Sequence, residues 1–355
     1  MNARRKAVRT DQELECPRID AALRDAGLDL VLIPDGAGEN ALIDAVADAE
    51  LLLMCYTPIT ARVIAAAPKL KGIVKYGVGV DAIDIAAARA RRIPVVNVPE
   101  YAEETVAEGA FALMIALAKK VQPIGREMSA QGWAWPTPRW LGNDLAGKTL
   151  ALVGAGKIGR SMARMGGAGF RMRVLGFDPN VSAETMAAAG IEKCDDLHAM
   201  LAQADFVSIH AVLNDQSRGL VDAAALAAMK PSAFLVNVAR GAIVDEMALL
   251  RALQDKRIAG VALDVYSAEP LALSGHPLSA LFGMDNVILF PHLTFYTAEA
   301  MARLEEDTLA RCFEILEGRP VEIRSRDPRL RAQEHGVAFV DQVQAVDRER
   351  GETGR

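Results

Sequence analysis

The stretch TLALVGAGKIG, residues 149–159, decides the fold that this sequence predicts. Its first five residues form an unbroken apolar run, which is typical of a strand buried on both faces of a parallel sheet. The next six match G-x-G-x-x-G, and the stretch KIGRSMARM then continues as a helix. A strand, a glycine-rich turn and a helix in this order predict the first βαβ unit of a dinucleotide-binding domain. The alternative is a glycine-rich turn that binds no ligand.

Each conspicuous residue of this turn has an expected role. Gly154 permits the tight turn, Gly156 lets the backbone approach a pyrophosphate, and Gly159 lets the helix pack closely against the sheet. The helix begins at Lys157 and Ile158, where unpaired N–H groups and a partial positive charge attract phosphates. These five residues are therefore candidates for cofactor binding.

An acidic residue, Asp178, follows the next apolar run and lies 19 residues beyond Gly159. A carboxylate at this place accepts hydrogen bonds from the adenosine ribose of NAD and repels the 2′-phosphate of NADP. No arginine follows it directly, because the next residues are Pro179 and Asn180. The sequence therefore predicts NAD as the cofactor, and the alternative interpretation of Asp178 is an ordinary surface acid.

Short apolar runs alternate with alanine-rich amphipathic stretches on both sides of this unit, which is the pattern of parallel sheets covered by helices. After the unit, strands are predicted at 173–177, 205–210, 233–238, 258–264 and 286–290. Before it, strands are predicted at 29–34, 50–55, 72–76 and 94–98, and helices at 39–47, 60–67, 84–92 and 103–121. The segment 122–147 contains all three tryptophans and three prolines, so a loop-rich crossover without regular structure is predicted there.

The fold class that follows is α/β, with two flavodoxin- and Rossmann-like domains built on parallel sheets. The substrate domain is expected to comprise residues 1–115 and 297–325, with a long helix at 297–317. The NAD-binding domain is expected to be inserted in it as residues 116–296. The basic start of the chain is expected to be disordered. Residues 326–355 are charged with little periodicity and are expected to form a mobile tail or an interaction arm.

The composition limits the partners. A formal net charge of −6 argues against nucleic acid, because phosphate binding requires clustered lysine and arginine. No apolar run approaches the roughly 18–20 residues that span a bilayer, and no secretory signal is recognisable, so neither a membrane nor secretion is expected. A cytoplasmic protein is the prediction. The four cysteines match no metal-ligand spacing and are expected to be reduced thiols, with no metal site: Cys16, Cys55, Cys194 and Cys312.

Three residues suited to hydride chemistry follow predicted strands. An enzyme that reduces a keto acid needs a cation for the carboxylate, a proton donor, and a group that tunes the donor. Arg240, Glu269 and His292 each follow one of the last three predicted strands. Ligands bind at the carboxyl ends of the strands in open α/β sheets, so we expect these side chains to converge at one edge. Taken singly, each is equally well explained as a turn residue or a solvated side chain.

Further motifs resemble those of the D-isomer-specific 2-hydroxyacid dehydrogenase family. The resemblance extends from about residue 71 to residue 317. It includes KYGVGVDAIDI, TVAE, GAGKIG, NVARGAIVDEMAL, ALDVYSAEP and FPHL. The chain is similar to the glyoxylate and hydroxypyruvate reductases or to the phosphoglycerate dehydrogenases within that family.

The resemblance implies a role for each candidate residue. Arg240 binds the carboxylate and carbonyl oxygen of the substrate, His292 donates a proton to that oxygen, and Glu269 stabilises the charged form of His292. The backbone of Val78 and Gly79 binds the carboxylate from the other domain, so the active site is expected between the domains. Asp264 is expected at the nicotinamide, and the other implied cofactor contacts are His210 and Val238. A homodimer through the nucleotide-binding domain is also implied.

The predicted function is NAD-dependent hydride transfer at C2 of a small 2-hydroxy or 2-keto acid, with glyoxylate or hydroxypyruvate as leading substrates. Formate is excluded, because Glu269 stands where the formate-oxidising branch carries glutamine. Phe295 and Tyr296 replace residues that are small in many members and are expected to shape the substrate pocket. A tryptophan of the crossover either reaches the active site of a partner subunit or packs the dimer. The alternative function is an NAD-sensing binding protein, like the transcriptional corepressors that share this fold and an Arg/Glu/His trio.

Overall fold

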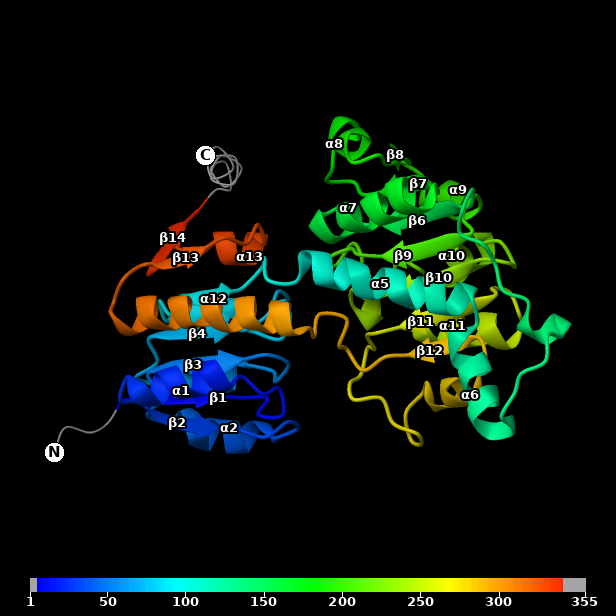
Figure 1. Cartoon of the computed structure of the whole chain (residues 1–355). Helices are drawn as coiled ribbons and strands as arrows, with labels where there is room; N and C mark the ends of the chain where they lie inside the picture. Colours follow the sequence, from blue (N-terminus) through cyan, green and yellow to red (C-terminus); the bar gives the residue numbers. More distant parts are fainter. Residues whose placement is uncertain (1–4, 341–355) are drawn as a thin grey trace, which may run out of the picture. The chain divides into compact units, whose positions relative to one another are not determined.

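The computed structural model describes residues 5–340 and places them in two compact units (Figure 1). The first unit comprises Met1–Ala102 and Thr297–Arg355, and the second comprises Glu103–Tyr296. The second unit is therefore inserted in the sequence of the first. Each unit is built on a parallel sheet, so the predicted α/β class with an inserted domain is confirmed.

The first unit contains a five-stranded parallel sheet in the order β2-β1-β3-β4-β5. Its strands are β1 (Lys6–Arg9), β2 (Asp29–Leu32), β3 (Leu51–Met54), β4 (Gly72–Lys75) and β5 (Val95–Asn97). The prediction of a disordered start is wrong for β1, which the sequence does not reveal because only two apolar residues lie between Lys6 and Arg9. Arg9 is nevertheless buried, since its guanidinium pairs with Asp20 at 2.7 Å.

Helices cover this sheet. They are α1 (Pro17–Asp25), α2 (Glu39–Val46), α3 (Ala61–Ala65), α4 (Ile85–Ala90) and the long α12 (Ala298–Leu316). Helix α12 returns from the far end of the chain and packs against α1, β3 and β4. A Cβ atom at Gly72 would lie 2.5 Å from the side chain of Ile315, so this glycine lets α12 approach β4 closely.

The segment after α12 is also folded. It forms β13 (Val321–Ile323), α13 (Pro328–Arg331) and β14 (Val337–Phe339), and β13 pairs with β14 in parallel. The expectation of a mobile tail from residue 326 is therefore wrong up to Val340, the alternative of an interaction arm stays a prediction, and the rest of that tail lies outside the described residues.

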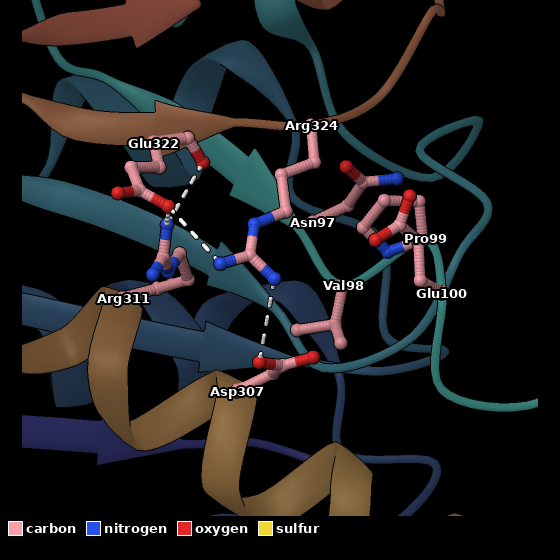
Figure 2. Close-up of a pocket in the computed structure, with 8 residues that line it drawn as sticks. All are labelled: Asn97, Val98, Pro99, Glu100, Asp307, Arg311, Glu322 and Arg324. Carbon is pink, nitrogen blue, oxygen red and sulfur yellow. Dashed lines mark hydrogen bonds and ion pairs between the residues drawn. The ribbon is translucent and has the colours of Figure 1, made fainter. Parts of the chain in front are cut away.

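Ion pairs explain why so charged a segment folds. Figure 2 shows Arg311 of α12 on Glu322 of β13 at 3.0 Å, and Arg324 between Glu322 at 3.2 Å and Asp307 at 3.8 Å. Hydrogen bonding to Arg311 holds the pKa of Glu322 below its usual range. In addition, the side chain of Gln333 accepts a hydrogen bond from the N–H of Val95 in β5 and donates one to its carbonyl oxygen. The pocket drawn in Figure 2 thus contains paired charges that hold Glu322 and Arg324 against α12.

The second unit contains a seven-stranded parallel sheet in the order β12-β11-β10-β9-β6-β7-β8. The six predicted strands are present as β6 (Thr149–Val153), β7 (Arg173–Phe177), β9 (Phe206–Ile209), β10 (Phe234–Asn237), β11 (Gly260–Leu263) and β12 (Val287–Leu289). The two-residue β8 (Glu192–Lys193) is too short and polar to be predicted. The chain builds outward from β6 in one direction and from β9 in the other, so the strand order reverses between these neighbours.

The principal helices of this unit are α5 (Glu103–Ala118), α6 (Val121–Gln131), α7 (Lys157–Arg164), α8 (Ala183–Ala188), α9 (Leu197–Leu201), α10 (Ala223–Ala228) and α11 (Glu246–Gln254). Figure 1 shows α5 lying along the sheet, and its apolar residues pack against β10 and β11. The domain boundary expected at 115/116 falls inside α5. The absence of regular structure predicted for 122–147 is wrong where α6 forms, since Pro123 is tolerated in its first turn.

Two findings limit the kinds of site within residues 5–340. None of the helices there is both long and apolar enough to cross a membrane. No group of three or more His, Cys, Asp or Glu side chains there is arranged to hold a metal ion.

Candidate active site

The three predicted catalytic residues follow three neighbouring strands of the larger sheet. Arg240 follows β10, Glu269 follows β11 and His292 follows β12, in that spatial order. The strands end at the same level, because Asn237 pairs in register with Leu263, which pairs with Leu289. The sheet therefore presents the loops that carry these residues side by side at its carboxyl edge.

Glu269 and His292 form a direct pair. The imidazole Nδ1 lies 2.9 Å from Glu269 Oε2, while Oε1 accepts a hydrogen bond from the N–H of Tyr266 at 2.9 Å. Burial on its own raises the pKa of Glu269, but the hydrogen bond and charge of His292, the Tyr266 N–H and the charge of Arg240 outweigh it. The pKa of the carboxyl is lowered as a result. Glu269 is therefore an anion at neutral pH, and it holds the imidazole of His292 through Nδ1.

Close backbone packing brings the Arg240 loop against the Glu269 loop. A Cβ atom at Gly241 would lie 2.1 Å from the carbonyl carbon of Tyr266 and 2.2 Å from the nitrogen of Ser267. Only glycine permits this approach, because real Cβ atoms do not come within 3.0 Å of backbone atoms. Arg240 itself donates to the carbonyl oxygen of Ala239 at 2.7 Å. Its charge is near enough to lower the pKa of Glu269.

Asp264 holds the turn that carries His292. Its carboxylate accepts hydrogen bonds from Leu293 N at 2.8 Å, Thr294 N at 3.1 Å and Thr294 Oγ1 at 2.5 Å. Only 1% of Asp264 is exposed, and burial raises the pKa of its carboxyl against these hydrogen bonds. His292 has φ +59°, a left-handed conformation that costs a residue other than glycine on the order of 1 kcal/mol. The hydrogen bonds of Asp264 stabilise that turn, and the nicotinamide contact expected for Asp264 stays a prediction.

The predicted nucleotide turn joins β6 to α7. Gly154 has φ +98°, and a Cβ atom there would lie 2.6 Å from the backbone of Ala211. At Gly159 a Cβ atom would meet the carbonyl oxygen of Gly154 at 2.3 Å, whereas at Gly156 it would meet no atom within 4 Å. The turn is thus tight where the sequence predicts packing and open where it predicts a ligand. The first N–H groups of α7 lack partners within the helix, and they lie next to the open position at Gly156.

Asp178 is anchored to this turn. Its carboxylate accepts hydrogen bonds from Ala155 N at 3.0 Å and from Asn180 N at 2.9 Å. The carboxylate is therefore held beside the glycine-rich turn at the end of β7. This placement fits an acceptor for the adenosine ribose, as the sequence predicts.

The other predicted cofactor residues lie at or near the same edge. His210 follows β9, and its Nε2 lies 2.8 Å from Ser208 Oγ, while the buried Nδ1 has no hydrogen-bond partner in the described chain. Burial lowers the pKa of His210 to about 4, so the imidazole is neutral at pH 7. Val238 directly follows β10 and is buried. The ammonium of Lys157 forms an ion pair with Glu103 at 2.9 Å.

The aromatic residues after His292 differ from each other. Phe295 is buried and stands edge-on to His292, with ring centroids 6.4 Å apart at 86°. Tyr296 is exposed and stacks edge-on against Phe295 at 5.9 Å. Phe295 therefore packs beside the imidazole, and Tyr296 is the one that presents surface to solvent.

The predicted carboxylate-binding loop belongs to the first unit and follows β4. Val78 is 46% exposed, and within the described residues the N–H groups of Val78 and Gly79 donate to no acceptor. The buried side chain of Asn97 donates to the carbonyl oxygen of Val78 at 2.6 Å. The loop thus carries two adjacent N–H groups without acceptors in the described residues, and the hydrogen bond from Asn97 fixes its backbone.

The sequence interpretation missed the supporting residues of the site. Thr294, Tyr266 and Asn97 each orient a predicted residue or its loop through a hydrogen bond. Asn97 ends a strand, which is a usable signal for a site residue. Thr294 bonds to Asp264, a partner distant in sequence, and Tyr266 acts through its backbone N–H, so neither side chain gives a local signal.

Residues 111–294 match the sequence profile of the NAD binding domain of the D-isomer specific 2-hydroxyacid dehydrogenases. The matched segment is more than half of the chain. The chain belongs to this family. Membership confirms the resemblance seen in the sequence, and it identifies the second unit as an NAD-binding domain of an oxidoreductase family.

Two relatives within the 2-hydroxyacid dehydrogenase family differ in the reaction that their names give and in their length. The glyoxylate reductase of Korarchaeum cryptofilum is 38% identical over 271 residues, which are 76% of this chain and 80% of that one. The D-3-phosphoglycerate dehydrogenase of Mycobacterium tuberculosis is 39% identical over 276 residues, which are 77% of this chain and 50% of that one. The chain thus spans about half the length of the phosphoglycerate dehydrogenases that it matches.

Solved structures of the family share the fold. A D-lactate dehydrogenase from Aquifex aeolicus, crystallised with NAD and lactic acid, matches with a TM-score of 0.77 at 26% identity. The match covers 88% of this chain and 96% of that one. The two-domain 2-hydroxyacid dehydrogenase fold therefore extends over most of the described residues.

Proposed function

We propose that this chain transfers a hydride between NAD(H) and C2 of a small 2-hydroxy or 2-keto acid. The observation that carries the proposal is the Glu269–His292 pair, held at the carboxyl edge beside the loop of Arg240. A cation, a proton donor and an anion that orients the donor are the groups that this reaction requires. Family membership and the names of the relatives support the same chemistry.

Each residue has one role in this proposal. Arg240 binds the substrate carboxylate and polarises the carbonyl group. His292 gives the proton on Nε2 to the carbonyl oxygen while C2 receives the hydride, so that an alcohol forms and the imidazole becomes neutral. Oxidation of the alcohol runs these transfers in reverse. Glu269 keeps the imidazole in place through Nδ1 and stabilises its protonated form.

The glycine-rich turn and Asp178 fit the cofactor. NADH, when bound, supplies the hydride to C2. The open space at Gly156 admits a pyrophosphate to the N-terminus of α7, and the anchored carboxylate of Asp178 accepts from the ribose hydroxyls. A 2′-phosphate would meet that same carboxylate, so NAD is preferred over NADP.

The proposed substrates are small 2-keto acids, with glyoxylate and hydroxypyruvate first. The similarity to a glyoxylate reductase over 80% of its length supports this choice. Formate remains excluded in this proposal, because its oxidation involves no proton transfer to a carbonyl oxygen, whereas the Glu269–His292 pair is built for such a transfer.

The test is NADH oxidation with glyoxylate, hydroxypyruvate, pyruvate, phenylpyruvate and oxaloacetate. Arg240→Ala and His292→Ala are measured in parallel with His198→Ala, a control at an exposed residue of α9. The proposal expects turnover of at least one acid that both site variants lose and the control keeps. If NADH binds tightly and no acid turns over, the NAD-sensing binding protein becomes the better explanation.

We further propose that the protein acts as a homodimer. Trp133 and Trp135 are 56% and 73% exposed and lie edge-on to each other at 6.1 Å. Large exposed apolar patches mark protein–protein contacts. Light scattering of the wild type and of a Trp133→Ser/Trp135→Ser variant tests this, and a wild-type monomer with full activity would also end the idea that a tryptophan serves a partner's active site.

A further inference from the structure

A buried lysine lies at the end of β4, directly before the proposed carboxylate-binding loop. Lys75 is 5% exposed. Its ammonium donates to the carbonyl oxygen of Cys55, lies 3.3 Å from Cys55 Sγ and is 5.4 Å from the centre of the Tyr56 ring. Within residues 5–340 no carboxylate forms an ion pair with it. Burying a charge without an opposite charge nearby costs free energy, so a bound anion would stabilise this ammonium.

Asp11 shares the neighbour Cys55 with Lys75, but its carboxylate is already hydrogen-bonded elsewhere. Asp11 accepts hydrogen bonds from the N–H groups of Cys55, Tyr56 and Thr57, and from the hydroxyls of Thr57 and Thr10. It therefore holds the segment 55–57 from one side, while Lys75 holds the carbonyl oxygen of Cys55. The positive charge of Lys75 is not neutralised by direct contact with Asp11.

The ammonium also lies directly against the loop. A Cβ atom at Gly77 would be 2.9 Å from Lys75 Nζ and 3.1 Å from its Cε atom. The next two residues, Val78 and Gly79, carry the open N–H donors, and Asn97 fixes the carbonyl oxygen of Val78. Two adjacent backbone donors on a loop that contacts a buried cation are suited to bind an anion.

We propose that Lys75 is a substrate-positioning residue, whose buried charge makes the Val78–Gly79 loop selective for a carboxylate. This inference rests on the proposed function. Lys75 acts through the field at the loop and touches neither the reacting carbon nor the cofactor. A buried charge is screened little by salt, so its effect persists at physiological ionic strength.

The test compares Lys75→Gln, which keeps a hydrogen-bond donor for Cys55 but loses the charge, with Lys75→Arg, which keeps the charge. We expect Lys75→Gln to raise KM for the best keto acid about tenfold with kcat within about twofold, the size of one unit charge acting over a few ångströms. Lys75→Arg retains most of the affinity. Thermal melting and NADH titration verify that both variants fold.

A second readout separates charge from mere support of the loop. Oxamate and its uncharged amide, oxamide, are titrated into the NADH complex by fluorescence, which needs no turnover. Lys75→Gln is expected to weaken oxamate about tenfold and to leave oxamide unchanged. Equal losses for both probes, or for Gln and Arg alike, would overturn the inference, as would an unchanged KM in Lys75→Gln. If the wild type reduces no keto acid, the proposed function fails, and the two probes still decide the role of Lys75.

Discussion

Gly241→Ala tests the geometry of the site at its tightest point. The new Cβ atom would lie 2.1 Å from the carbonyl carbon of Tyr266 and 2.2 Å from Ser267 N. Carbon atoms pack at about 3.5–4.0 Å, so the Arg240 loop and the Glu269 loop must separate by more than about 1 Å. Both obstacles are backbone atoms, so no side chain can rotate away to relieve the clash.

The expected loss follows from this displacement. A misplacement of about 1 Å at a catalytic group costs on the order of 100-fold in rate, which is about 2.7 kcal/mol of transition-state stabilisation. Overpacking also destabilises the fold by about 1–3 kcal/mol. Binding of NADH should change little, because the glycine-rich turn follows β6, which lies two strands away from β10.

The assay is kcat/KM for the best keto acid together with an NADH titration and a thermal melt. Gly283→Ala is the matched control, because a Cβ atom there meets nothing within 4 Å in the same unit. Normal kcat/KM in a folded Gly241→Ala would refute the reasoning that close contact of these two loops aligns Arg240 with Glu269. A loss shared equally by Gly283→Ala would refute it as well.

Three further predictions concern single side chains. Glu269→Gln should lower kcat/KM at least about tenfold. Its deficit in melting temperature at pH 7 should begin to shrink as the pH falls below about 4.3, the ordinary pKa of glutamate, and should disappear only below the lowered pKa of Glu269, because such a carboxyl stabilises the fold only while it is ionised. His210→Gln should melt with a weaker dependence on pH between about 6.5 and 4, because burial lowers the pKa of His210 to about 4 and the unfolded chain takes up its proton first; identical pH profiles by scanning fluorimetry would contradict this. Asp178→Ser should raise KM for NADH about tenfold and improve use of NADPH in the same steady-state assay, whereas an unchanged ratio of the two cofactors would count against the ribose contact.

Local patterns predicted most of the sheet strands because those strands consist mainly of apolar residues. The run at 149–153 followed by the glycine-rich turn is an example, since every constraint on it lies within a dozen residues. Strand β1 escaped prediction because its burial depends on Arg9 meeting Asp20, and β13 because the ion pair of Glu322 with Arg311 of α12 compensates its charge. Helix α6 escaped because it contains Pro123 and Gly125, residue types that are typical of loops.

The sequence by itself determined the βαβ order, the glycine-rich turn with its acid after β7, and the fact that Arg240, Glu269 and His292 each follow a strand. These features depend on short-range periodicity and on the conformational preferences of glycine, and both can be recognised within a short segment of sequence. Only the tertiary structure decided that β10, β11 and β12 are neighbours, that Gly241 admits the Glu269 loop, that Asp264 holds the turn at His292, and that the ammonium of Lys75 lies against Cys55. Each of these depends on packing between segments distant along the chain, and no local pattern carries that information.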